Sequence, residues 1–126
     1  MKYKKTILII DDMKPIRDIL WFSLKQEGYR PILAESGRKG LQALLDRQNH
    51  IDLIILDVMM PRMDGYQVLE KIRKSNHLIS NVPVIMLTAK AQKQDVLKGI
   101  KKGANDYIVK PYKFPDLLVK IKNLIG

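Results

Sequence analysis

Three kinds of side chain that can act together on a charged group come at the ends of short apolar runs in this sequence. Asp57 ends one run, the adjacent pair Asp11 and Asp12 ends another, and Thr88 and Lys110 end two more. Such runs are typical of strands buried on both faces of a parallel sheet. Open α/β sheets bind ligands beyond the carboxyl ends of their strands, so these residues are candidates for one site.

The chemistry of this set is that of a metal-assisted phosphoryl transfer. Three carboxylates in one cleft repel one another and therefore require a cation. The chain has no cysteine, and neither histidine lies near an acidic strand end, so oxygen ligands select a hard ion, expected to be Mg²⁺ with Mn²⁺ as a substitute. Asp57 stands alone and is the expected nucleophile and acceptor, whereas the pair Asp11 and Asp12 can hold the metal.

Alternating strands and helices must position these residues. The apolar runs predict five strands, at Lys5–Ile10, Arg30–Glu35, Leu53–Leu56 (ending on Asp57), Val82–Leu87 and Tyr107–Val109. Helices are predicted between them from helical spacing, with Pro15 in a first turn, Ser36 as a cap, Asp64-Gly65 at the start of the third helix, and Gly28, Asn49 and Gly103 as stops. Val96, Leu97 and Ile100 mark the fourth helix. The apolar residues of the last helix extend from Leu117 to Ile125.

This alternation predicts an α/β fold, a doubly wound parallel sheet of the flavodoxin-like (βα)5 type in a single domain, residues 1–126. Right-handed crossovers leave the strand order 2-1-3-4-5 as the best match at this length. The first and third strands are then neighbours, which brings Asp11, Asp12 and Asp57 together at the point where the strand order reverses.

Composition limits the other possibilities. The first apolar run is too short for a signal peptide or a membrane span, so a cytoplasmic protein without a membrane association is expected. The net charge of +10 comes from lysines dispersed along the chain, with few aromatic residues among them. This pattern indicates a solvated surface more than a nucleic-acid site, so direct nucleic-acid binding is not expected.

Taken together, the short motifs resemble one known family. They are Asp11-Asp12, the run from Leu56 to Pro61, Met63-Asp64-Gly65, Thr88-Ala89, and Gly103-Ala104 leading to Tyr107 and Lys110-Pro111. In this order and spacing they resemble the receiver domain of two-component response regulators, including the chemotaxis regulators, over essentially the whole chain.

The resemblance implies a role for each matching position. Asp57 would be the phosphoacceptor. Asp11, Asp12, Asp57 and the backbone carbonyl of Met59 would bind Mg²⁺. Lys110 would contact the phosphoryl group, and its bond to Pro111 would be cis. Thr88 and Tyr107 would form the switch.

The resemblance also implies partners. The phosphoryl group would come from a sensor histidine kinase, a phosphotransfer protein or a small phosphodonor. The receiver would supply the catalytic groups, so the chain would be a signalling phosphoacceptor and not an enzyme in the usual sense. The surface of the fourth helix, fifth strand and fifth helix would then bind an output partner or a second copy. Lysines concentrate on this last third of the chain, which leaves an acidic partner, a phosphorylation-driven dimer, nucleic acid or simple helix-surface charge as interpretations: Lys90, Lys93, Lys98, Lys101, Lys102, Lys113, Lys120 and Lys122.

Four positions depart from the usual receiver pattern. Met13 stands where many receivers carry an acidic or aromatic residue, and Asn105 stands where an Asp often precedes Asp106. Met59 and Lys90 occupy the positions that tune acyl phosphate hydrolysis in the family. An apolar Met59 cannot orient an attacking water by a hydrogen bond, so slow autodephosphorylation is expected.

Other interpretations of the same residues remain open. Asp57 could bond only to its own loop, Thr88 could cap a helix, Tyr107 could be a core residue and Lys110 could be solvated. A haloacid-dehalogenase type of enzyme would need a second Asp at position 59, which is Met, and a flavodoxin-like FMN carrier would place phosphate against Asp11 and Asp12. A receiver-like module that does not use phosphate is the third alternative.

Overall fold

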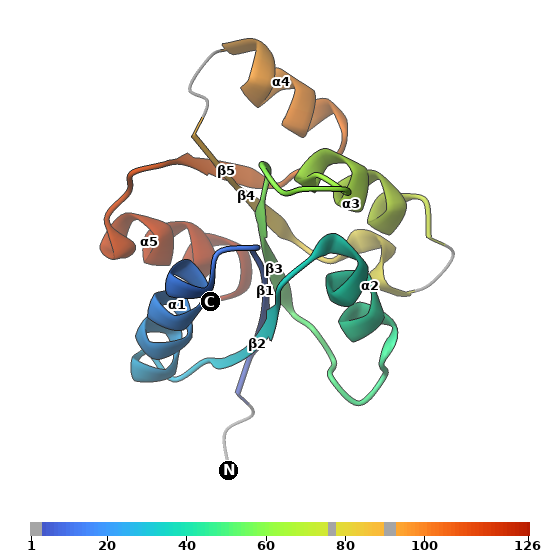
Figure 1. The fold of residues 1–126 in the computed structure, drawn as a ribbon. Helices are drawn as coiled ribbons and strands as arrows, with labels where there is room; N and C mark the ends of the chain where they lie inside the picture. The colour runs from blue at the N-terminus through green and yellow to red at the C-terminus, as the bar shows by residue number, and fades with distance from the viewer. Residues whose placement is uncertain (1–3, 76–77, 90–92) are drawn as a thin grey trace.

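The computed structural model describes residues 4–75, 78–89 and 93–126, and within them strands and helices alternate along the chain (Figure 1). The strands are β1 (Thr6–Ile10), β2 (Arg30–Ala34), β3 (Leu53–Asp57), β4 (Val84–Thr88) and β5 (Asp106–Val109). The helices are α1 (Lys14–Gln26), α2 (Gly37–Leu45), α3 (Gly65–Arg73), α4 (Lys93–Lys101) and α5 (Phe114–Ile125), with a 3-10 turn, η1 (Leu78–Asn81), before β4.

The five strands form one parallel sheet in the order β2-β1-β3-β4-β5, which confirms the predicted topology. Helices cover both faces of the sheet (Figure 1). On one face α1 and α5 bury Leu20, Leu24, Leu117 and Ile121 against the strands. On the other face α2 and α3 pack on the second core cluster, through residues such as Leu44 and Leu69, and α4 lies beside them at the β4 and β5 side.

Local signals in the sequence set the helix ends. The Ser36 side chain accepts a hydrogen bond from the Lys39 N–H at the start of α2. Asp64 and Gln67 form a reciprocal capping box at the start of α3, which satisfies two backbone donors that the helix cannot pair itself. Gly28 has φ +88° just after α1, a conformation that glycine adopts without strain.

Two element ends differ from the prediction by more than one residue. The strand expected from Val82 begins at Val84, because the Val82 N–H bonds back to Ile79 in η1 and Pro83 has no N–H to give to the sheet. The stop expected at Asn49 comes earlier, since α2 ends at Leu45. The Asn49 side chain still serves this helix end, because its amide donates to the carbonyl of Ala43.

In the fourth helix, the apolar residues that predict the helix are not all buried. Its predicted residues do lie on α4, but Leu97 and Ile100 are 43% and 51% exposed. The helix instead approaches β4 through Gly99, where an added Cβ would lie 3.3 Å from the Met86 sulfur. This line of contact turns part of the apolar surface of α4 outward. Among the described residues, no helix is both long and apolar enough to cross a membrane.

Candidate functional site

The register of β1 and β3 brings the first and third acidic positions side by side. Ile10 pairs with Leu56 across the two parallel strands, so Asp11 and Asp57 follow at the same edge of the sheet. Both carboxylates are buried, with 0% and 3% of each residue exposed, while Asp12 is exposed. One carboxylate oxygen from each of Asp11, Asp12 and Asp57 lies within 4.8 Å of the others. The structure therefore forms the predicted acidic cluster.

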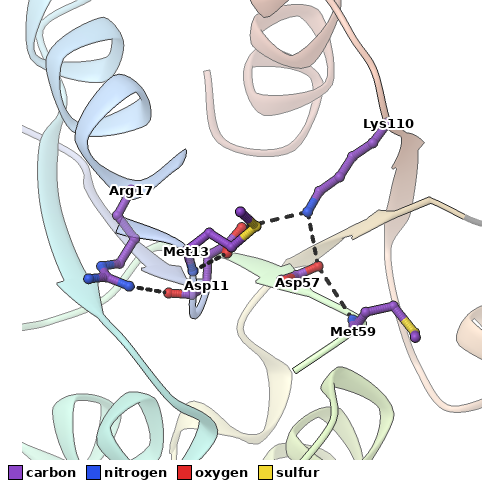
Figure 2. Close-up of polar contacts among 6 residues, drawn as sticks. All are labelled: Asp11, Met13, Arg17, Asp57, Met59 and Lys110. Atoms are coloured by element: carbon purple, nitrogen blue, oxygen red, sulfur yellow. Dashed lines mark hydrogen bonds and ion pairs between the residues drawn. The ribbon is translucent and has the colours of Figure 1, made fainter. Parts of the chain in front are cut away.

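Lys110 enters the same pocket from the end of β5. Its Nζ lies 3.1 Å from Asp57 Oδ1 and 3.8 Å from Asp11 Oδ2 (Figure 2). Its backbone N–H donates to the carbonyl of Thr88 at 2.7 Å, which fixes the start of the loop after β5 against β4. The Lys110-Pro111 peptide bond is cis, as the resemblance to receiver domains implied. A solvated Lys110 is thus not what the structure shows.

Burial makes both inner carboxylates costly to ionise. The pKa of Asp57 rises from 3.8 to about 6, chiefly because of burial and then because of the charge of Asp11. Lys110 and the Met59 N–H act in the opposite direction. Burial also raises the pKa of Asp11, although the Met13 N–H and the Lys110 charge oppose it. A bound cation would relieve this penalty, because it favours the ionised forms.

One atom in the cluster points directly to a cation. Asp11 Oδ2 is buried and has no hydrogen-bond partner among the described residues. A buried carboxylate oxygen without a partner is expensive, so such an atom usually has an ion or water. Among the residues that the structure describes, the donor set consists of carboxylate oxygens without a sulfur or nitrogen ligand, which fits a hard divalent ion such as Mg²⁺.

The loop after β3 is held closely against Asp57. The Met59 N–H donates to Asp57 Oδ1 at 3.4 Å, and the Val58 N–H donates to the Leu87 carbonyl. Gly65, the first residue of α3, packs on the Asp57 backbone, since an added Cβ would lie 2.4 Å from the Asp57 carbonyl oxygen. This close approach requires glycine. The Met59 side chain is 57% exposed at the rim, and its carbonyl as a metal ligand stays a prediction.

Thr88 and Tyr107 lie on neighbouring strands and line the same small cavity. Thr88 is the last residue of β4 and is buried, while Tyr107 on β5 is half-buried against the core, with Lys120 Nζ 5.8 Å from its ring centre. This cavity lies under α4 and has a volume of about 10 Å³, enough room for about one water molecule. The two predicted switch residues therefore line one cavity.

Two other positions named from the sequence, Asn105 and His50, lie away from the cluster. Asn105 lies at the opposite end of β4, where its Oδ1 accepts hydrogen bonds from Arg73 and from the Val84 N–H. His50 is exposed beside Asp52, as expected of a surface residue. Lys90, named above for its effect on hydrolysis, lies outside the described residues, as does His77.

With this geometry in place, comparison with known proteins is decisive. A family model described as the response regulator receiver domain matches residues 7–122. The chain belongs to this family. Its receiver fold, its parallel sheet and its place in two-component signalling follow from that membership, whereas the role of each site residue stays a prediction for this receiver.

Relatives of the receiver include longer regulators. It is 41% identical over 119 residues to the transcriptional regulatory protein PcoR of Escherichia coli, covering 94% of this chain and 50% of that protein. It is 40% identical over 122 residues to the probable transcriptional regulator ycf27 of Cyanophora paradoxa, covering 97% of this chain and 48% of that protein. The receiver thus spans about half the length of these relatives.

Solved structures of receivers match it along nearly its whole length. The chemotaxis response regulator CheY4 of Vibrio cholerae superposes with a TM-score of 0.89 at 28% identity, covering 98% of this chain and 100% of that one. A putative response regulator from Chloroflexus aurantiacus gives a TM-score of 0.88 at 34% identity, covering 97% and 98% of the two chains. These similarities confirm the resemblance to the chemotaxis regulators.

Two residues near the receiver's acidic cluster were not found from the sequence. Arg17 donates to the backbone carbonyl of Asp11, and helical spacing from Met13 was the signal that could have placed it over this turn. Tyr112 lies near the pocket, since burial and then the charges of Asp11 and Asp57 raise its pKa to about 12. Its position two residues after Lys110 gave no such indication.

Proposed function

We propose that this receiver accepts a phosphoryl group on Asp57 in a magnesium-dependent reaction. The donor would be a histidine kinase, a phosphotransfer protein or a small phosphodonor, and the setting would be the cytoplasm. The observation that carries the proposal is the buried Asp57 carboxylate held 3.1 Å from Lys110 Nζ, in a cluster with Asp11 and Asp12. The chain would act as a signalling phosphoacceptor that contributes to its own phosphorylation and dephosphorylation.

Each side chain would have a defined part in the transfer. A carboxylate oxygen of Asp57 forms the new P–O bond while the bond from phosphorus to the donor's nitrogen or carboxylate oxygen breaks. Asp11, Asp12, Asp57 and the Met59 carbonyl would hold Mg²⁺, with Mn²⁺ as a substitute, and the ion would supply positive charge to the phosphoryl oxygens. Lys110 neutralises a further part of the negative charge on the phosphoryl oxygens, and the Thr88 hydroxyl donates a hydrogen bond to one of them.

Protonation sets the pH at which Asp57 can react. With a pKa of about 6, the carboxylate is mostly ionised at pH 7 and becomes protonated as the pH falls through 6. A protonated carboxyl is a poor nucleophile, so acceptance of phosphate by the metal-free site would decline on the acid side. Bound Mg²⁺ would lower this pKa and extend the reactive range.

The output would be a shift in the population of two arrangements. A phosphoryl group adds roughly two negative charges and three acceptor oxygens at Asp57. Recruitment of Thr88 toward them would change the cavity that it shares with Tyr107, and so bias α4, β5 and α5. That face would bind an output partner or a second copy. Lys102 and Lys120 on it are paired with Glu70 and Asp106, so only part of its positive charge is available to a partner.

The acceptor can be tested by mass spectrometry. Incubation with acetyl phosphate and Mg²⁺ is expected to add one phosphoryl mass, and Asp57→Asn is expected to abolish the addition. Asp116→Asn, which changes an exposed carboxylate on α5 that lies outside the cluster, is the matched control and should keep it. A mass shift that survives in Asp57→Asn places the acceptor elsewhere. A wild-type protein that takes up no phosphate would be a receiver-like binding module.

The lifetime of the acyl phosphate gives a second prediction. Met59 is exposed at the rim but offers no hydrogen bond to an attacking water. Met59→Asn is expected to speed autodephosphorylation about fivefold, the effect of one hydrogen bond of about 1 kcal/mol made in the transition state. Loss of the phosphoryl mass with time measures the rate. Leu78→Asn, at a fully exposed residue of η1, is the control and should leave it unchanged, and a wild-type lifetime of seconds would contradict slow hydrolysis.

A further inference from the structure

Asp11 is held in place at every polar atom except one. Its N–H donates to the Ala34 carbonyl at 3.1 Å, its Oδ1 accepts from the Met13 N–H at 2.9 Å, and its carbonyl accepts from Arg17 Nη1 at 2.8 Å. The remaining atom, Oδ2, is buried without a hydrogen-bond partner in the described part of the chain, and it lies 3.8 Å from Lys110 Nζ. The protein thus orients this carboxylate and leaves one oxygen for the pocket.

Arg17 is the only side chain among the three hydrogen-bonding partners that fix Asp11. Figure 2 shows it reaching the Asp11 backbone from α1, while Lys110 approaches the acidic cluster from the β5 side. The guanidinium therefore touches the turn that carries Asp11 and does not touch the cluster of carboxylates. Its position is that of a support behind a ligand and not of a ligand-binding group.

The start of α1 explains why such a support is needed. A helix usually begins with a side chain that accepts a hydrogen bond from its first turn, but the cap residue here is Met13, which makes no such bond. The Arg17 N–H bonds to the Met13 carbonyl, and the Arg17 side chain then reaches back to Asp11. The arginine therefore fastens the acidic turn to the helix in the absence of a capping side chain.

We infer that Arg17 is the positioning residue of the magnesium site, acting through the backbone of Asp11 to hold its Oδ2 toward the metal. The inference rests on the proposed function, because it takes Asp11 as a ligand of Mg²⁺. Residues that orient metal ligands from behind typically change metal affinity by about 10- to 100-fold when they are removed.

The sign of the effect separates positioning from electrostatics. Arg17 is a cation near a site for another cation, so at a pH where Asp11 is ionised, charge alone predicts that its removal strengthens Mg²⁺ binding. Positioning predicts the opposite, because a loosened Asp11 must be ordered again when the metal binds. A variant without the charge and without the donor therefore decides between the two roles by the direction of the change.

The test is a Mg²⁺ titration followed by backbone amide NMR shifts of the folded protein. Arg17→Met keeps the apolar stem and removes the donor, and it is expected to weaken Mg²⁺ binding about tenfold. Arg17→Lys keeps a donor of similar reach and is expected to restore most of the affinity. Arg30→Met makes the same change of net charge at an exposed residue at the opposite end of the sheet and should leave the affinity nearly unchanged.

Hydrogen exchange of the metal-free protein supplies a second measurement. Arg17→Met is expected to speed exchange of the Met13 amide, which bonds to Asp11 Oδ1, while the amides of β3 keep their protection. Unchanged or tighter Mg²⁺ binding in Arg17→Met would overturn the inference and leave the proposed function standing. A wild-type protein whose acidic turn shows no response to Mg²⁺ would overturn both.

Discussion

Asp57→Asn is expected to stabilise the metal-free protein at pH 7, with a rise in the free energy of unfolding of up to about 3 kcal/mol. The ionised carboxylate of Asp57 is buried beside Asp11, and Lys110 offsets only part of that cost, which is why its pKa rises from 3.8 to about 6. An uncharged amide of the same shape avoids the cost. The residue proposed for the chemistry is therefore one that the fold would be more stable without.

The dependence on pH follows from the direction of the shift. Below pH 3.8 the Asp57 carboxyl is protonated in both the folded and the unfolded chain, so Asp and Asn should be nearly equivalent. Between 3.8 and about 6 the unfolded chain is ionised while the folded chain keeps its proton, so the wild type loses stability as the pH rises. Above 6 both states are ionised, and the full difference between the two proteins should be present.

Urea unfolding of both proteins in EDTA, from pH 4 to pH 8, measures this difference. Saturating Mg²⁺ should narrow it, because the ion binds the folded wild type and stabilises it by mass action. Asp116→Asn controls for the loss of one exposed negative charge. A difference between wild type and Asp57→Asn that stays constant from pH 4 to pH 8 would contradict the assigned origin of the effect.

The positions of the acidic residues could be predicted because a strand buried on both faces requires an uninterrupted run of apolar residues. An apolar run that ends on Asp57, and another that ends on Asp11, can only place both residues at the carboxyl edge once the strands are parallel. Caps at Ser36 and Asp64 are equally local, since each depends on a donor three residues ahead. Fold and cluster thus follow from short-range signals joined by one topological rule.

Other features depend on contacts between distant residues, which no local pattern records. Leu97 and Ile100 have the spacing of a helix face, but the close approach at Gly99 decides which side of α4 meets the sheet. In the sequence, Asn105 stands where many receivers carry an Asp. In the structure it is an acceptor for Arg73, thirty-two residues away along the chain.

Arg73→Met is expected to lower the free energy of unfolding by about 3–5 kcal/mol, because it removes several hydrogen bonds from a charged donor at once. Its Nη1 donates to the carbonyls of Ser80 and Val82, its Nε to the carbonyl of Gly103, and its Nη2 to Asn105 Oδ1, at 2.7–3.0 Å. The guanidinium thereby joins α3 to η1 and to the turn between α4 and β5. Burial lowers its pKa, which records the cost of keeping this charge among neutral acceptors.

Arg73→Lys should cost about half as much, because one ammonium group cannot serve the four acceptors that the planar guanidinium reaches together. Lys74→Met, at the next residue, removes only an exposed ion pair with Glu70 and should change the free energy of unfolding by less than about 1 kcal/mol. Asn105→Asp, which gives Arg73 a carboxylate as its acceptor, should raise the free energy of unfolding by about 1 kcal/mol. If Arg73→Met lowers the free energy of unfolding by no more than Lys74→Met does, the hydrogen bonds of Arg73 do not stabilise the fold. Because Arg73 lies at the opposite end of the strands from Asp57, folded Arg73→Lys should still take up phosphate.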